Sequence, residues 1–195
     1  MVSNIKSEQL GKKIKDKWVF RHIDFEVTSG EALFIEGPNG AGKSVLLQTL
    51  AGFWKGNEGS LTIQQNTSKD IAYCPFHAGL DEFMKLKDSL IPWIGKNNCI
   101  QALEHWGLSD WMFKRVNSLS SGQHKRALLA RTFFMDSNIL LLDEPFIGLD
   151  QTYRSLLLTS IKEKLDKGHI IIFTGHHVDL GDSFQPKTLE MQLTK

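Results

Sequence analysis

Residues 37–44 read GPNGAGKS, and this stretch decides the fold. It fits the pattern G-x-x-x-x-G-K-[ST] at every fixed position. An apolar run over residues 32–35 precedes it, and a helix-like run over residues 45–51 follows it. A strand, a glycine-rich loop and a helix in this order predict a loop that holds phosphate groups. The alternative is a glycine-rich turn that only joins a strand to a helix, and the complete motif with its correct flanks argues against it.

The predicted loop contains the residue types that phosphate binding requires. Its glycines let the backbone turn tightly and bring N–H groups close to phosphate oxygens. The following helix adds free N–H donors and the positive end of its dipole. Lys43 is expected to reach the β- and γ-phosphates of a nucleotide, and Ser44 to offer its hydroxyl to Mg²⁺. The predicted loop residues are Gly37, Pro38, Asn39, Gly40, Ala41, Gly42, Lys43, Ser44 and Val45.

The composition limits the class of protein. A chain of 195 residues, 41% of them hydrophobic, suits one domain with a sizeable core, and its net charge of +1 gives no electrostatic reason to expect a nucleic-acid partner. The longest apolar runs, such as residues 139–142, are too short to span a bilayer, and the lysine-rich start lacks the apolar segment of a secretory signal. Cys74 and Cys99 form no C-x-x-C pair, so we expect two reduced thiols, buried or half-buried.

Strands and helices alternate along most of the chain. Residues 18–27 alternate between apolar and polar and predict a half-exposed antiparallel strand, whereas the all-apolar residues 139–142 predict a parallel strand buried on both faces. The fold class is therefore α/β, with a mainly parallel sheet, an antiparallel β part and a ligand site at the carboxyl ends of the strands. Further strands are expected over residues 32–36, 60–64, 71–74 and 170–173, and helices from the phosphate loop to about residue 52, over 121–135 and over 151–167.

Residues 76–116 differ from their surroundings and predict a small helical insert within a single domain of residues 1–195. Prolines and glycines interrupt the start of this segment, and apolar residues then recur at helical spacing. Three tryptophans fall in the insert, and we expect them to pack in its core. A tryptophan that is exposed instead would be a candidate contact for a partner protein. These tryptophans are Trp93, Trp106 and Trp111.

The second strong signal is ILLLDEP over residues 139–145. An apolar strand delivers two carboxylates to its carboxyl end, and adjacent strand residues point to opposite sides. Asp143 is therefore assigned to Mg²⁺, through a water molecule, and Glu144 is assigned as the general base for an attacking water. The alternative is an acidic pair that only caps a buried strand. The position of the pair, about a hundred residues after a phosphate loop, argues against it.

The third signal, LSSGQ over residues 119–123, resembles the L-S-G-G-Q signature of the ABC (ATP-binding cassette) ATPases. Residues 124–131 (HKRALLAR) continue the resemblance, residues 148–150 resemble the D-loop, and residues 174–176 resemble the segment that ends in the switch histidine. The resemblance covers roughly residues 18 to 180, and these motifs in this order are very specific. It implies an ABC cassette of the P-loop NTPase class that binds ATP and Mg²⁺ and hydrolyses ATP.

The resemblance also implies that two chains share each site. In ABC ATPases two cassettes face head to tail, and each ATP lies between one phosphate loop and the signature of the other subunit. Asp150 would tie the two sites together, and His176 would contact the γ-phosphate or the attacking water, with its neighbour His177 as the alternative. The implied partner is a second cassette, identical or related. The signature residues that would contact the nucleotide in trans are Ser120, Ser121, Gly122 and Gln123.

This sequence departs from the family pattern in three places. Ser121 replaces the usual first glycine of the signature, which is a small change. The glutamine that normally follows the strand at residues 71–74 is missing, because Phe76 and His77 stand there, and His77 is a candidate substitute. The aromatic residue that stacks on adenine is either Trp18 or Phe20, with core packing the more expected role of Phe20.

The subfamily and the function follow from the same resemblance. Residues 73–90 and 102–131 are similar to ATP-binding subunits of the haem exporter of cytochrome c maturation. We therefore expect an ATPase subunit of a membrane transporter, peripheral at the cytoplasmic face of the inner membrane and docked to integral membrane subunits through the insert. The competing hypotheses are a soluble ABC ATPase that acts on ribosomes or DNA, and a regulatory cassette that binds ATP but hydrolyses it poorly.

Overall fold

The computed structural model describes residues 4–64, 71–76, 79–176, 180–181 and 183–193. One sheet consists of β3 (Ala32–Glu36), β5 (Ile71–Cys74), β6 (Ile139–Leu142), β7 (Ile170–Gly175) and β8 (Lys187–Glu190), and a second of β1 (Asn4–Ile14), β2 (Lys17–Thr28) and β4 (Glu58–Gln64). The helices are α1 (Lys43–Leu50), α2 (Leu86–His105), α3 (Ser121–Phe134) and α4 (Gln151–Asp166), with 3₁₀ turns at η1 (Ser109–Trp111) and η2 (Val116–Ser118).

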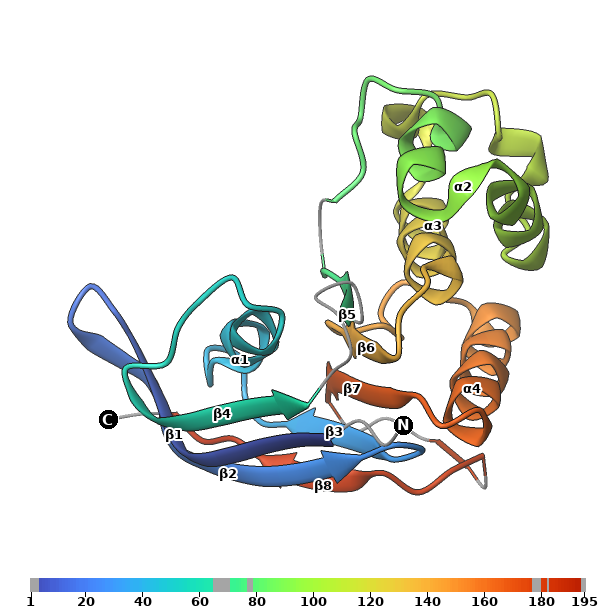
Figure 1. Ribbon diagram of the computed structural model, residues 1–195. Coiled ribbons are helices and arrows are strands. Elements are labelled where there is room, and N and C mark those ends of the chain that lie inside the picture. Colours follow the sequence, from blue (N-terminus) through green and yellow to red (C-terminus); the bar gives the residue numbers. More distant parts are fainter. Residues whose placement is uncertain (1–3, 65–70, 77–78, 177–179, 182, 194–195) are drawn as a thin grey trace.

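The two sheets differ in strand direction, as the sequence predicts. The larger sheet is parallel, in the order β5-β6-β7-β3-β8, and the smaller sheet is antiparallel, in the order β2-β1-β4. Helix α1 lies beside the antiparallel sheet, whereas α2, α3 and α4 lie on the other side of the parallel sheet (Figure 1). The predicted fold class is thereby confirmed.

Strands β3, β6 and β7 are almost entirely apolar because both of their faces are buried. In β6, Ile139 and Leu141 pack toward α1 and the antiparallel sheet, whereas Leu140 and Leu142 pack toward α2, α3 and α4. Strands β3 and β7 divide their side chains in the same way. Because these strands run parallel, the carboxyl ends of β3, β6 and β7 lie at one edge of the sheet, where the phosphate loop begins.

The helical insert forms mainly from α2, which bends at Gly95 (φ 77°), three residues after Pro92. A glycine tolerates this backbone conformation without a steric penalty, so the bend costs little. Trp106 is fully buried against Phe133 of α3, as core packing predicts, and Trp111 is half-buried. Trp93 is instead 56% exposed.

Two strands had no clear sequence signal. Strand β1 lies between β2 and β4, yet its register shifts near Leu10 and Lys12, and it buries Ser7 and Lys12. These irregularities remove the alternation that would reveal a strand. Strand β8 pairs with the edge of β3, and its residues are largely exposed, so the sequence there shows no apolar run.

Candidate functional site

The phosphate loop leaves the carboxyl end of β3 and enters α1 at Lys43. Gly37 (φ 144°) lies against the carbonyl of Met191, and Gly42 (φ 92°) forms the N-cap of α1. Both positions have positive φ and closely packed neighbours, so residues with a Cβ would be strained there. The loop therefore presents the free N–H groups of the first turn of α1, which is a general anion-binding arrangement.

The Lys43 side chain is buried beneath this loop, with 6% exposure. Its ammonium donates hydrogen bonds to the carbonyls of Gly37 at 2.7 Å and Pro38 at 3.2 Å, and it lies 3.4 Å from Nε2 of His176. The cation is thus held between the phosphate loop and the end of β7. Ser44 is half-buried in the first turn of α1, and Val45 packs against the core beneath it.

His176 joins three elements that are far apart in the sequence. Its Nε2 lies 2.9 Å from Oδ1 of Asn39 in the phosphate loop and 3.9 Å from Oε1 of Glu144, which follows β6. It lines a cavity of about 340 Å³ with Gly37 and Pro38, and a second cavity of about 320 Å³ with Glu144 and Thr174. The imidazole therefore lies where the phosphate loop meets the acidic pair. His177, like His77, lies outside the described residues.

The two acidic residues diverge because of a turn rather than strand alternation. Strand β6 ends at Leu142, and Glu144 adopts a left-handed backbone conformation with φ 45°. A residue other than glycine pays about 1 kcal/mol for that conformation, so neighbouring contacts must hold it. The expectation that pleating separates Asp143 from Glu144 is therefore wrong, although the two side chains do point to different partners.

Thr174, at the end of β7, contacts both acidic residues. Its hydroxyl accepts a 2.8 Å hydrogen bond from the backbone N–H of Glu144 and donates one of 2.8 Å to Oδ1 of Asp143. Asp143 is 3% exposed, so this hydrogen bond satisfies a buried carboxylate oxygen. Thr174 was not among the predicted site residues. Its signal was a polar residue that ends an apolar strand directly before Gly175 and His176.

A buried lysine, Lys125 of α3, lies behind the acidic pair. Its ammonium donates a 3.0 Å hydrogen bond to the carbonyl of Asp143 and lies 5.4 Å from the ring centroid of Phe76, one of the two residues expected to stand where the family has glutamine. Burial lowers the pKa of Lys125, while Cys74, Asp143 and Glu144 act in the opposite direction. Burial also raises the pKa of the Cys74 thiol, and Cys74 and Cys99 are both buried free cysteines, as expected.

The signature residues form the start of α3. Ser120 is the N-cap, its hydroxyl accepts from the N–H of Gln123 at 3.3 Å, and the Gln123 side chain accepts from the N–H of Ser120 at 2.9 Å. This capping box fixes the first turn, in which Ser121 is exposed and Gly122 faces the carbonyl of Gly148. The signature thus presents an ordered helix N-terminus.

Two further predicted residues lie at the margins of the site. Asp150 is exposed and caps α4 by accepting a 3.0 Å hydrogen bond from the N–H of Tyr153. Trp18 is half-buried, with Lys13 and Arg21 over its ring at 4.4 and 4.2 Å, and it lines a cavity of about 470 Å³ with Leu193. Phe20 is 2% exposed and packs in the core, as expected.

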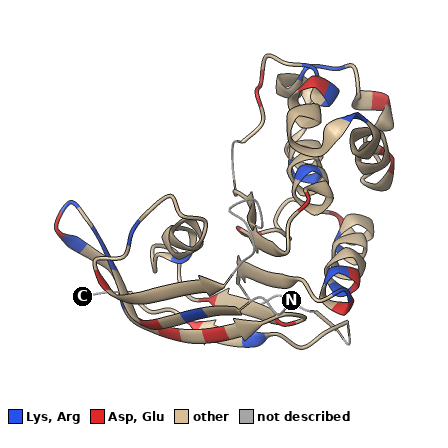
Figure 2. Cartoon of the chain, in the orientation of Figure 1, with Lys and Arg blue, Asp and Glu red and all other residues tan. Residues whose placement is uncertain are grey.

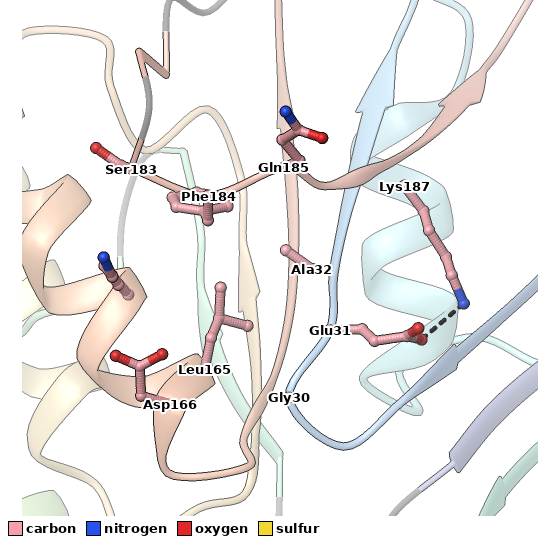
Figure 3. A pocket seen from close by; sticks show the side chains of 10 residues that line it. Gly30, Glu31, Ala32, Leu165, Asp166, Ser183, Phe184, Gln185 and Lys187 are labelled. Atoms are coloured by element: carbon pink, nitrogen blue, oxygen red, sulfur yellow. Dashed lines mark hydrogen bonds and ion pairs between the residues drawn. The ribbon is translucent and has the colours of Figure 1, made fainter.

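A separate cavity of about 290 Å³ lies at the amino end of β3, away from the phosphate loop (Figure 3). It is lined by Gly30, Ala32 and Leu165, and an ion pair of 2.6 Å joins Glu31 to Lys187 beside it. That ion pair holds the pKa of the Glu31 carboxyl below its usual value.

Comparison with known proteins agrees with this geometry. The family model described as ABC transporter matches residues 20–147. This chain belongs to the ABC transporter ATP-binding family. The cassette is 33% identical over 177 residues to the Cytochrome c biogenesis ATP-binding export protein CcmA of Hahella chejuensis, covering 83% of each chain. It is 30% identical over 192 residues to the Manganese transport system ATP-binding protein MntB of Halalkalibacterium halodurans, covering 89% of the cassette and 76% of the relative.

The fold of the cassette also matches solved structures. A structure titled "Structure of ATP binding subunit of ABC transporter" superposes with a TM-score of 0.86 at 20% identity, covering 97% of the cassette and 87% of that chain. The cassette is therefore an ATP-binding and ATP-hydrolysing subunit of an ABC membrane transporter. Among the residues that the structure describes, no helix is both long and apolar enough to cross a membrane.

Proposed function

We propose that the geometry around His176 assembles the hydrolytic site of this ATPase. The phosphate loop and Lys43 hold the phosphates, Glu144 takes a proton from the attacking water, and His176 contacts the γ-phosphate or that water. The observation that carries this proposal is that the His176 ring lies within 4 Å of Asn39, Lys43 and Glu144, and so joins the phosphate loop to the base. Phosphoryl transfer needs mainly positioning and charge neutralisation, which these groups supply.

The donor atoms fit Mg²⁺. Thr174 donates a hydrogen bond to Oδ1 of Asp143, so the second carboxylate oxygen is left for a water-mediated contact with Mg²⁺. The Ser44 hydroxyl is the other candidate ligand. Within the described part of the chain, no group of three or more His, Cys, Asp and Glu side chains is arranged to hold a metal ion. That agrees with Mg²⁺, which takes few protein ligands and several waters and phosphate oxygens. When bound, Mg²⁺ neutralises charge that develops on the phosphate oxygens.

The assignment of the base is tested by replacing Glu144 with glutamine. Glu144→Gln should lower ATP turnover by at least about 100-fold, because the amide cannot accept the proton, while ATP-driven pairing of the cassettes persists. The matched control is Glu163→Gln, at an exposed glutamate of α4, which should hydrolyse ATP at the parent rate. Turnover of Glu144→Gln at the parent rate would show that another group is the base.

We further propose that the cassette works as a dimer, with Ser120, Ser121, Gly122 and Gln123 contacting the ATP of the partner cassette. The phosphate loop leads into α1 and the signature begins α3, and these helices lie in different parts of the molecule (Figure 1). The capped first turn of α3 offers N–H groups to an anion. Asp150 would then lie near the partner. Light scattering of Glu144→Gln with ATP and Mg²⁺ tests this directly, and a monomer under those conditions would contradict it.

The insert is our proposed docking surface for integral membrane subunits. Exposed apolar side chains gather there: Phe83 (77% exposed), Met84 (44%), Trp93 (56%) and Phe113 (64%). Such patches on a folded domain are typical of protein contacts. Positive and negative side chains are interspersed over the chain (Figure 2), which supports the expectation that nucleic acid is not a partner. We place the cassette at the cytoplasmic face of the inner membrane as a peripheral subunit.

We propose haem export for cytochrome c maturation as the transport process, by analogy with the CcmA relatives. The MntB relatives make manganese transport the second candidate. Identification of the membrane protein that co-purifies with the cassette separates the two. Loss of covalently haem-stained cytochrome c in a strain without the cassette would support haem export, whereas loss of manganese uptake with normal cytochrome c would support the second candidate.

Trp18 is our proposed adenine-stacking residue. Its ring is half-buried and lines the cavity beside Leu193, whose side chain in turn lies near Gly40 of the phosphate loop. Phe20 is only 2% exposed and packs in the core, so Trp18 is the better candidate. A base that stacks on Trp18 would displace or join the cations that now cover the ring.

A further inference from the structure

We infer that Lys125 is a positioning residue for hydrolysis, because it holds the peptide group that aims Glu144. This inference rests on the proposed role of Glu144 as the base. Lys125 lies in α3, the helix that begins with the signature, and not in the phosphate loop. Its proposed role is to connect α3 to Glu144 within one chain.

The peptide between Asp143 and Glu144 is held at both of its polar ends. Its carbonyl accepts the 3.0 Å hydrogen bond from Lys125, and its N–H donates the 2.8 Å hydrogen bond to Thr174. These two contacts fix the plane of the peptide, and the plane sets where the left-handed Glu144 residue (φ 45°) directs its carboxylate. If one contact is lost, the left-handed conformation loses part of its support, and the carboxylate can rotate away from the attacking water.

The Lys125 contact is internal and charge-assisted. The side chain is 4% exposed, and the carbonyl that it binds lies just beyond β6, where the ladder with β7 has ended. A hydrogen bond from a buried cation to a carbonyl is stronger than one from a neutral donor, and the cation would be costly to leave unpaired. The Phe76 ring at 5.4 Å is a further stabilising contact on the same ammonium.

The position of Lys125 in α3 gives this contact a mechanical role. The first turn of α3 carries the signature, with Gly122 against the carbonyl of Gly148, and Lys125 follows within the next turn. Helix α3 therefore contacts both ends of the segment 143–148: Lys125 binds the carbonyl of Asp143, and Gly122 lies against the carbonyl of Gly148. A shift of α3 when the signature engages the partner's ATP would move the Asp143–Glu144 peptide, and so couple one ATP site to the base of the other.

The test compares the ATPase kinetics of Lys125→Met, Lys125→Arg and a matched control. The control is Lys12→Met, because Lys12 is also buried (8% exposed), also donates to a backbone carbonyl (Lys55, 2.9 Å) and also lies near an aromatic ring (Trp54, 5.1 Å). It lies in the antiparallel sheet, away from the acidic pair. Lys12→Met should therefore report the general cost of losing a buried lysine.

We expect Lys125→Met to lower kcat by about 10- to 100-fold, with KM for ATP within about twofold of the parent. The reason is that ATP still binds while the Glu144 carboxylate is no longer held in position. Lys125→Arg should recover most of kcat, since guanidinium can donate to the same carbonyl, and Lys12→Met should match the parent. The inference is overturned if Lys125→Met retains the parent kcat, or if Lys12→Met loses as much. A double variant with Thr174→Val should lose much less than the product of the two single losses, because both residues hold one peptide.

A replacement variant and a parallel measurement separate a loss of folding, or a wrong base, from a loss of positioning. If Lys125→Met does not fold by circular dichroism, Lys125→Gln replaces it, because its amide stays polar yet falls short of the Asp143 carbonyl, and the same loss of kcat is expected. Glu144→Gln is measured in parallel. Parent-level turnover of Glu144→Gln would overturn the role of Glu144 itself, whereas an inactive Glu144→Gln beside a fully active Lys125→Met would overturn the positioning role alone.

Discussion

The hydroxyl of Thr174 donates a 2.8 Å hydrogen bond to Oδ1 of Asp143, across two neighbouring parallel strands. The hydroxyl oxygen of Thr174 also accepts a hydrogen bond from the backbone N–H of Glu144. One hydroxyl thus orients the proposed magnesium ligand and supports the backbone of the proposed base. Neither contact is visible in the motif that ends in His176, because Thr174 and Asp143 are 31 residues apart and meet only through sheet pairing.

Replacement of Thr174 tests this double contact. Thr174→Val keeps the shape but removes the donor and acceptor, so kcat should fall by about 10- to 100-fold while the fold is retained. Thr174→Ser keeps the hydroxyl and should stay within about threefold of the parent. The measurement is steady-state ATP hydrolysis. Equal activity of the valine and serine variants would mean that the hydroxyl does not support the reaction.

The proposed stacking role of Trp18 predicts a selective effect on nucleotide affinity. Base–aromatic stacking contributes about 1–3 kcal/mol, so Trp18→Ala should raise the Kd for ATP by about 5- to 150-fold, and Trp18→Phe should restore most of the affinity. Calorimetric titration of ATP into each variant measures this. Trp54→Ala is the control, since Trp54 lies beyond the end of α1, is 42% exposed and donates a hydrogen bond to the Gln48 side chain. An unchanged Kd for Trp18→Ala would transfer the stacking role to another residue.

The ion pair between Glu31 and Lys187 predicts a pH-dependent stability difference. Hydrogen bonding to Lys187 lowers the folded-state pKa of Glu31, so its contribution is fully present above the unfolded pKa of about 4.3 and is lost as the pH falls through the folded value. Glu31→Gln should therefore lower Tm at pH 7, and its difference from the parent should shrink below pH 4. Thermal unfolding across pH 3–8 measures this, with exposed Glu163→Gln as the control. A constant difference across that range would contradict the pairing.

The insert shares its core with α3, and Trp106 is the test of that continuity. Trp106 is fully buried and packs 5.8 Å from Phe133, so Trp106→Ala should destabilise the cassette by about 3–5 kcal/mol. Ile100→Ala, at a residue of α2 that is 50% exposed, should change stability by at most about 0.5 kcal/mol. Urea unfolding followed by far-UV circular dichroism measures both. Similar values for the two variants would indicate that the insert is not packed on α3.

Local patterns account for most of the architecture. The phosphate-loop motif, the strand at residues 71–74 and the strand that begins at residue 139 were predictable because glycine, charge and continuous apolar runs impose local structure directly. Strand β1 was not, because its register shifts and its buried Ser7 and Lys12 erase the period of two. In that strand, pairing to β2 and β4 outweighs the weak local preference.

The site residues also differ in whether local sequence predicts them. Residues 37–44 and the acidic pair could be named without coordinates, since each belongs to a contiguous motif whose residue types the reaction requires. The roles of Thr174 and Lys125 could not, because a hydroxyl and an ammonium gain their meaning from the buried groups that they contact. Those contacts join α3, β6 and β7, which are separate in the chain. Only the packing of the sheet against the signature helix brings them to one peptide.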